Sequence, residues 1–161
     1  MDQSISSNHL IRKYKNTDLD DVLCCWESAF RLAHTFIEET FIAKVRVDIP
    51  AIYLPNTETW VCVKEGKVVG FISLMGNEIA ALFVDPKKHG LGIGQTLVNK
   101  ACELRDEGLT VEVFKLNSLG RKFYSAYGFQ YVSEYLFEDV GETVLQLKLS
   151  LNNDLDISGK S

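Results

Sequence analysis

The sequence predicts an α+β fold in which a mixed, mostly antiparallel sheet is flanked by helices. After one short strand, two helical patterns precede a run of strand-like segments that has no intervening helices. The second half then alternates strand and helix, starting at a glycine-rich segment between an apolar strand and a helix. An antiparallel run joined to a strand-helix-strand unit is typical of a mixed sheet that contains one parallel strand pair.

Two helices are expected near the start of the domain. Residues 11–14 read as a short strand, and residues 18–30 place their apolar side chains on one helical stripe. A second helix is predicted to begin at Thr35, where Thr35 and Glu38 have the spacing of a capping box, and to run to about residue 47.

A strand meander is expected next. Residues 59–64 and 68–74 flank the turn Glu65-Gly66-Lys67 and read as a hairpin, and residues 79–84 add a third strand after Gly76-Asn77. These three strands form the antiparallel part of the predicted sheet.

The remaining elements alternate. A helix follows the glycine-rich segment, with apolar residues at helical spacing through Leu104, and a strand over 109–114 returns parallel to the strand over 79–84. A helix over 119–127 ends at Gly128 in the C-cap position. Strands over 129–135 and 143–149, joined by a turn at 138–142, complete the sheet.

Length and composition indicate one globular domain. The 161 residues, 46% of them hydrophobic, suffice for a single core, which we place at residues 10–151. The polar segments 1–9 and 152–161 are expected to be flexible. No basic region followed by an apolar run opens the sequence, and no apolar stretch approaches the roughly 20 residues of a membrane span. We therefore expect a cytoplasmic protein that does not act at a membrane, as a monomer or homodimer.

The charge and the cysteines exclude several classes of site. A net charge of −5 argues against nucleic acid as a partner and suits an amine substrate. The four cysteines show neither Cys-x-x-Cys spacing nor nearby paired histidines, so we expect no metal site and no disulfide framework. All four are interpreted as apolar residues of the core.

The glycine-rich segment predicts a site for a phosphorylated cofactor. Gly90, Gly92 and Gly94 remove side chains from a tight loop, and the helix after it offers unpaired N–H groups and the positive end of its dipole to a phosphate. A P-loop would need a lysine where Gln95 follows Gly94. A dinucleotide-binding fingerprint would need its third glycine at the position of Gln95. Glu112 does follow the glycines at about the sequence separation expected of the acid that binds a ribose, so a nucleotide-binding oxidoreductase remains a weaker alternative.

The loop and a second segment together resemble the GNAT superfamily of N-acetyltransferases. The loop reads His-Gly-Leu-Gly-Ile-Gly from His89, where the family has Arg or Gln at the position of the histidine. Residues 117–129 are similar to the family segment Asn-x-x-Ala-x-x-Phe-Tyr-x-x-x-Gly-Phe, with Gly120 in place of its alanine. The resemblance covers about residues 10–150 and implies a GNAT-like sheet whose central parallel pair splays apart to receive acetyl-CoA.

The resemblance also implies which residues bind the cofactor. The strand before the loop would pair its backbone with the pantetheine arm, the loop and the helix start would hold the pyrophosphate, and two residues of the second segment would complete the site. Asn117 has the alternative of simply capping its helix. The predicted cofactor-binding residues are Leu82, Phe83, Val84, His89, Gly90, Leu91, Gly92, Ile93, Gly94, Gln95, Thr96, Asn117 and Tyr124.

The implied reaction moves an acetyl group from acetyl-CoA to a primary amine, which is a protein lysine, an N-terminus or a small-molecule amine. Tyr124 matches the tyrosine that protonates the leaving thiolate, and a core aromatic is the alternative for it. Glu78 is the first candidate for the general base, Glu112 the second and His34 the third, and a chain of water molecules that depends on no single residue is an equal alternative. The predicted substrate-binding residues are His34, Phe36, Glu78 and Glu112. A non-catalytic acetyl-CoA sensor or interaction domain is the alternative function.

Overall fold

The computed structural model describes residues 9–151, which contain seven strands of one sheet. The strand order is β1-β2-β3-β4-β5-β7-β6, and the β4–β5 pair is parallel whereas the others are antiparallel. The strands are β1 (His9–Lys13), β2 (Glu58–Lys64), β3 (Lys67–Met75), β4 (Glu78–Val84), β5 (Leu109–Phe114), β6 (Gln130–Phe137) and β7 (Glu142–Leu149). The predicted mixed α+β sheet is confirmed.

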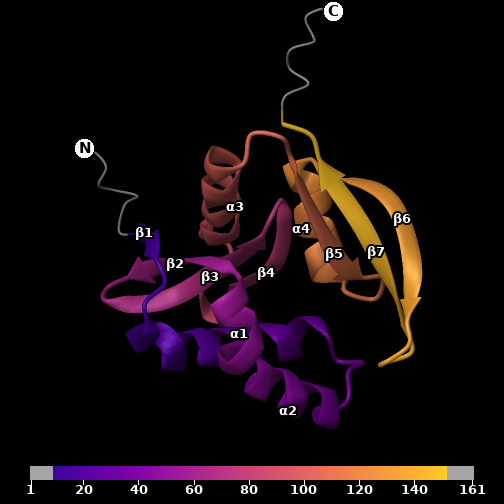
Figure 1. The fold of residues 1–161 in the computed structure, drawn as a ribbon, viewed down its shortest axis with the longest axis horizontal. Helices are drawn as coiled ribbons and strands as arrows, with labels where there is room; N and C mark the ends of the chain where they lie inside the picture. Colours follow the sequence, from indigo (N-terminus) through magenta and orange to yellow (C-terminus); the bar gives the residue numbers. More distant parts are fainter. Residues whose placement is uncertain (1–8, 152–161) are drawn as a thin grey trace, which may run out of the picture.

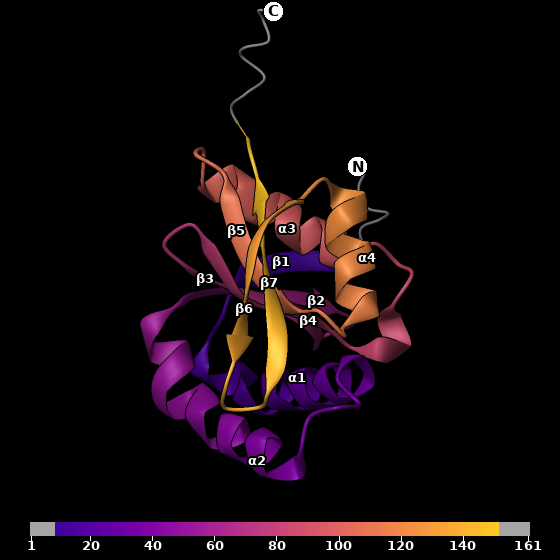
Figure 2. The same cartoon turned by 90° about the vertical axis from the view of Figure 1, so that its right-hand side faces the viewer.

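Four α-helices cover the two faces of this sheet: α1 (Leu19–Ala33), α2 (Glu39–Asp48), α3 (Ile93–Leu104) and α4 (Ser118–Tyr127). Figures 1 and 2 show α1 and α2 on one side and α3 and α4 on the other. Each side has its own apolar cluster. Trp26 and Phe30 of α1 pack on one face, and Leu97 and Val98 of α3 pack on the other. Burying both faces explains the near-continuous apolar run of β3.

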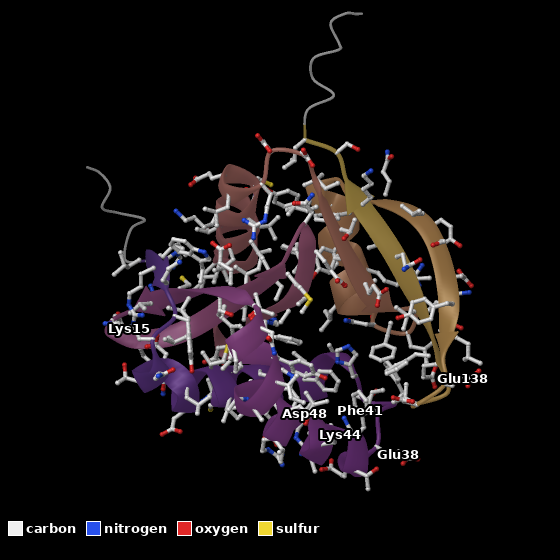
Figure 3. All side chains as sticks on the ribbon, in the orientation of Figure 1. Lys15, Glu38, Phe41, Lys44, Asp48 and Glu138 are labelled. Carbon is white, nitrogen blue, oxygen red and sulfur yellow. The ribbon has the colours of Figure 1, made fainter. Side chains whose placement is uncertain are left out.

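The α1/α2 side is closed at one end by the β6–β7 turn. Phe41 of α2 packs against Phe137, with ring centroids 6.1 Å apart, and Phe137 in turn packs against Phe114 of β5 at 6.3 Å. Figure 3 labels Phe41 on α2 and Glu138 at the start of that turn, where the two elements approach each other. Helix α2, the end of β6 and the end of β5 are therefore in contact on the α1/α2 side of the sheet.

The second helix begins later than the sequence predicted. Thr35 lies in a turn in which the Ile37 N–H donates to the His34 carbonyl at 3.2 Å, and Glu38, with extended backbone, precedes the first residue of α2. The capping box predicted at Thr35 is therefore wrong, because the chain turns there before the helix starts. Cys24 is exposed, so the interpretation of all four cysteines as core residues is also wrong for that residue.

β4 departs from regular pairing on both sides. On the β3 side, Ser73 pairs with Ala81 and Leu74 with Ile79, so Ala80 is an extra residue, a β-bulge. On the β5 side, pairing is limited to Glu78↔Thr110 and Ile79↔Val111. Beyond Ile79 the two parallel strands have no paired residues, which leaves an opening between them.

Flexible ends were expected at residues 1–9 and 152–161, and of these residues 1–8 and 152–161 lie outside the described part of the chain. The remaining residue, His9, is the first residue of strand β1. In the described part of the chain, no helix is long and apolar enough to cross a membrane.

Candidate active site

A cavity of about 660 Å³ occupies the opening between β4 and β5. Its walls come from β4, the glycine-rich loop, the start of α3, β5, α4 and the last turn of α1. Because α1 and α4 lie on opposite faces of the sheet, the cavity is lined from both sides. A long molecule that enters at the loop can therefore meet a second molecule that approaches from the α1/α2 side.

Two residues of β4 turn backbone groups toward this opening. The Asp85 N–H donates to the Val69 carbonyl at 2.9 Å, which makes Val69 and Asp85 a hydrogen-bonded pair of the β3–β4 ladder. Such pairs alternate along an antiparallel ladder, so Phe83 also bonds to β3, whereas Leu82 and Val84 direct their N–H and C=O groups away from it. The predicted backbone contacts to a pantetheine arm therefore fall on Leu82 and Val84, and Phe83 contributes its ring to the wall.

The glycine-rich loop has the backbone that an anion site needs. Gly90 and Gly92 have φ values of 86° and 79°, which favour glycine, and α3 begins directly after Gly92 without a side-chain cap on its first N–H groups. Those N–H groups point into the loop, so the residues present fit the pyrophosphate of acetyl-CoA. A Cβ at Gly94 would lie 3.1 Å from the Phe123 ring, so this glycine lets α3 approach α4.

His89, which stands where the resembling family has Arg or Gln, uses its side chain within the protein. Its Nε2–H donates to the Val84 carbonyl at 3.0 Å, on the side of β4 that faces the opening. The ring thus ties the loop to the end of the strand. Thr96 likewise donates its hydroxyl to the Gly92 carbonyl at 2.8 Å and holds the loop from the helix side.

Tyr124 lies on α4 in the wall of the cavity, and only 7% of it is exposed. Phe123 and Phe129 flank its ring, each at a centroid distance of 5.2 Å. Burial raises the pKa of Tyr124 well above its usual range, and no hydrogen-bonding partner within the described residues contributes to the shift. The phenol is therefore neutral at physiological pH.

The two candidate carboxylates lie near each other on adjacent strands. Burial raises the pKa of Glu78, and the charge of Glu112 raises it further. Glu112 lines the cavity and is held in place, because the Tyr135 hydroxyl donates to Oε1 at 2.7 Å and Gln146 Nε2 donates to Oε2 at 3.1 Å. Glu78 is not a lining residue and precedes Ile79, which is one.

His34 and Asn117 meet across the opening although they are 83 residues apart in the sequence. His34 follows the last residue of α1, is 7% exposed and lies between the rings of Phe30, Phe36 and Phe114. Asn117 caps α4 by accepting a hydrogen bond from the Gly120 N–H at 2.8 Å. Phe36 lies behind His34 and is not part of the cavity wall.

Several wall residues were not predicted from the sequence: Phe30 and Ala33 at the end of α1, Lys88 in the loop, and Leu119 and Phe123 on α4. Tyr135 and Gln146, which hold Glu112, were also missed. Their roles follow from the β5-β7-β6 strand order, which periodicity does not reveal. Among residues 9–151, no cluster of three or more His, Cys, Asp or Glu residues could hold a metal ion.

Acid should destabilise the protein through His34. Burial lowers the pKa of His34 to about 4, and the hydrogen bond to the Phe30 carbonyl offsets this only in part. Between the ordinary pKa of 6.5 and pH 4, the unfolded chain binds a proton that the folded chain does not, so stability rises with pH across this window. From pH 7 to pH 4, wild type should lose about 3 kcal/mol more unfolding free energy than His34→Gln in urea titrations. Equal losses in the two proteins would contradict the assignment.

The comparisons with known proteins all identify N-acetyltransferases. The sequence pattern of the acetyltransferase (GNAT) domain matches residues 55–131. The peptidyl-lysine N-acetyltransferase YiaC of Escherichia coli (strain K12) is 33% identical over 124 residues, 76% of this chain and 84% of the relative. The peptidyl-lysine N-acetyltransferase YjaB of Salmonella typhimurium is 30% identical over 140 residues, 86% of this chain and 95% of the relative. The solution structure of apo-form YjaB from Escherichia coli superimposes with a TM-score of 0.78 at 27% identity, covering 87% of this chain and 96% of that one.

Proposed function

The chain belongs to the GNAT family and is an acetyl-CoA-dependent N-acetyltransferase, and on that premise we propose that its acceptor is the ε-amine of a lysine in a protein or peptide. The observation that carries the proposal is that both relatives just described are named for peptidyl-lysine and are similar to most of this chain. The non-catalytic alternative considered from the sequence has no comparable support.

The cavity suits two substrates that meet from opposite faces of the sheet. Acetyl-CoA supplies an activated acetyl thioester, and the loop and β4 would hold its pyrophosphate and pantetheine. The lysine side chain would enter from the α1/α2 side, where Glu112 lines the wall and Glu78 lies nearby. A carboxylate pair attracts the ammonium form of the amine.

Glu78 would act as the general base. The ammonium must lose a proton before the nitrogen lone pair can attack the thioester carbon, and a carboxylate with a raised pKa is a better base than an ordinary one. Attack forms the C–N bond and places negative charge on the carbonyl oxygen. A backbone N–H of Leu82 or Val84, both on the open side of β4, would donate to that oxygen.

Tyr124 would act as the general acid. When the C–S bond breaks, the electron pair stays on sulfur, and the tyrosine hydroxyl donates its proton to the thiolate. The former amine nitrogen loses its remaining extra proton as the amide forms, and that proton returns to the phenolate. Burial raises the pKa of the Tyr124 phenol, and the same burial would disfavour a thiolate anion that stays unprotonated in the cavity.

The proposal is tested with a panel of amines that includes lysine peptides, polyamines and amino sugars, with release of free thiol from acetyl-CoA as the readout. A lysine peptide should give the highest kcat/KM. A polyamine or amino sugar with a higher kcat/KM would contradict the proposed acceptor class and leave the N-acetyltransferase activity intact.

The role of Glu78 predicts a pH-dependent loss. Glu78→Gln should lower kcat/KM on a lysine peptide more at pH 7 than at pH 9, because a lysine amine with a pKa near 10 loses its own proton increasingly as the pH rises. Glu112→Gln is the matched control: it removes the neighbouring charge that raises the pKa of Glu78, so the acidic limb of its pH profile should shift to lower pH. A Glu78→Gln deficit that is the same at both pH values would exclude Glu78 as the base.

A further inference from the structure

We propose that His34 is a positioning residue of the acyl-donor site: with its proton on Nδ1, it accepts a hydrogen bond from Asn117 and so fixes the N-terminal turn of α4, the helix that carries Tyr124. The inference rests on the roles proposed for the cavity and Tyr124, and not on the identity of the acceptor. In it, His34 is neither the base nor a substrate contact, which were the roles that the sequence suggested.

The contacts of the imidazole determine its tautomer. Nδ1 lies 2.9 Å from the Phe30 carbonyl oxygen, which can only accept, so Nδ1 carries the proton. The same carbonyl accepts the His34 backbone N–H at 2.9 Å, so the side chain folds back on the last turn of α1. In a neutral ring Nε2 is then an acceptor, and its neighbour at 3.3 Å is the side-chain amide of Asn117.

The orientation of that amide is determined from its other end. Asn117 Oδ1 accepts the Gly120 N–H at 2.8 Å, which places Nδ2 opposite His34 as a donor. A flipped amide would put two donors together at Gly120 and two acceptors together at His34. One chain of hydrogen bonds therefore runs from the Phe30 carbonyl through His34 and Asn117 to the first turn of α4.

Gly120 gives independent support for a fixed amide. A Cβ at this position would lie 2.6 Å from Asn117 Nδ2 and 3.0 Å from Val113 Cγ2. The alanine of the family pattern would therefore displace the Asn117 amide from its present position. The glycine, the asparagine and the histidine therefore form one interdependent set.

The position of the chain of bonds explains how it would affect the reaction. α4 spans Ser118–Tyr127, and Tyr124 lies about two turns beyond its Asn117 cap. His34 belongs to the opposite side of the sheet, so its bond to Asn117 crosses the opening and ties the acid-bearing helix to α1. Loosening this tie moves the tyrosine hydroxyl relative to the leaving thiolate, and such misplacement lowers kcat more than it weakens binding of the donor.

The test begins with the wild-type protein. Nitrogen NMR of His34 should show a protonated Nδ1 and an unprotonated Nε2 at pH 7. A protonated Nε2 would overturn the proposal without reference to any activity, so this result is independent of the acceptor question.

The kinetic test compares two replacements of similar size. His34→Leu removes the acceptor and should lower kcat about tenfold, the scale of one hydrogen bond, with the acetyl-CoA dissociation constant changed less than threefold. His34→Gln offers an oxygen near the position of Nε2 and should recover most of the loss. Asn117→Ala should add little once His34 is Leu. Equal kcat values for the Leu and Gln variants, or additive effects of the His34 and Asn117 changes, would overturn the proposal.

Discussion

Replacement of Tyr124 by phenylalanine should lower the turnover number by a factor on the order of 10² to 10⁴ while the affinity for acetyl-CoA stays nearly unchanged. The phenyl ring keeps its contacts with Phe123 and Phe129, so the fold loses only the hydroxyl. Among residues 9–151 no partner of the buried hydroxyl contributes to its pKa, so its removal leaves no buried polar group of that part of the chain unpaired. The measurement is steady-state thiol release together with calorimetric titration of acetyl-CoA.

Tyr127 provides the matched control on the same helix. Its hydroxyl contacts Asn99 and Cys102 and does not line the cavity, so Tyr127→Phe should retain wild-type turnover. Wild-type turnover in Tyr124→Phe would remove the assigned acid and indicate protonation of the thiolate by solvent.

Placing a glutamate at Gly92 should abolish binding of acetyl-CoA. At a concentration one hundred times its dissociation constant, the ligand should add about 2.7 kcal/mol to the unfolding free energy of wild type. Gly92 lies directly before α3, and a carboxylate there would compete with the phosphates for the free N–H groups. The ligand should add nothing to the stability of Gly92→Glu.

Gly66 separates this electrostatic effect from backbone strain. Its φ of 78° matches the 79° of Gly92, and a Cβ at either glycine meets no atom within 4 Å. Gly66→Glu, in the β2–β3 turn, should therefore have a similar conformational cost, and acetyl-CoA should still stabilise this variant as much as it stabilises wild type. A normal gain in Gly92→Glu, or the same loss in both variants, would contradict the loop as the pyrophosphate site.

Periodicity and turn chemistry were sufficient to predict most of the sheet. The strand over 109–114 and the helix end at Gly128 are confirmed. Both have local signals in the sequence, which are the alternation of apolar and polar residues in the strand and a glycine, free to adopt positive φ, at the end of the helix. The start of α2 was predicted wrongly for the same reason. Thr35 and Glu38 have capping-box spacing, but the contact of His34 with α1 and α4 holds the chain in a turn at that point.

Only the parts of the candidate site that lie within contiguous sequence motifs could be predicted. The loop glycines and Tyr124 are recognisable from contiguous motifs, and the structure brings them together around one cavity. The bonds of Glu112 to Tyr135 and Gln146 depend on strand register, and the bond between His34 and Asn117 joins two faces of the sheet. No local pattern encodes such pairs, so their roles became visible only in the folded chain.

The most direct test of the account is the mass of a peptide that carries one lysine and a blocked N-terminus, after incubation with acetyl-CoA and the protein. The account predicts one acetyl group on the lysine ε-amine for each free thiol released, with wild type and Tyr127→Phe alike and Tyr124→Phe slowed by a factor on the order of 10² or more. Thiol release without acetylated lysine, or acetylation that proceeds equally well with Tyr124→Phe, would contradict it.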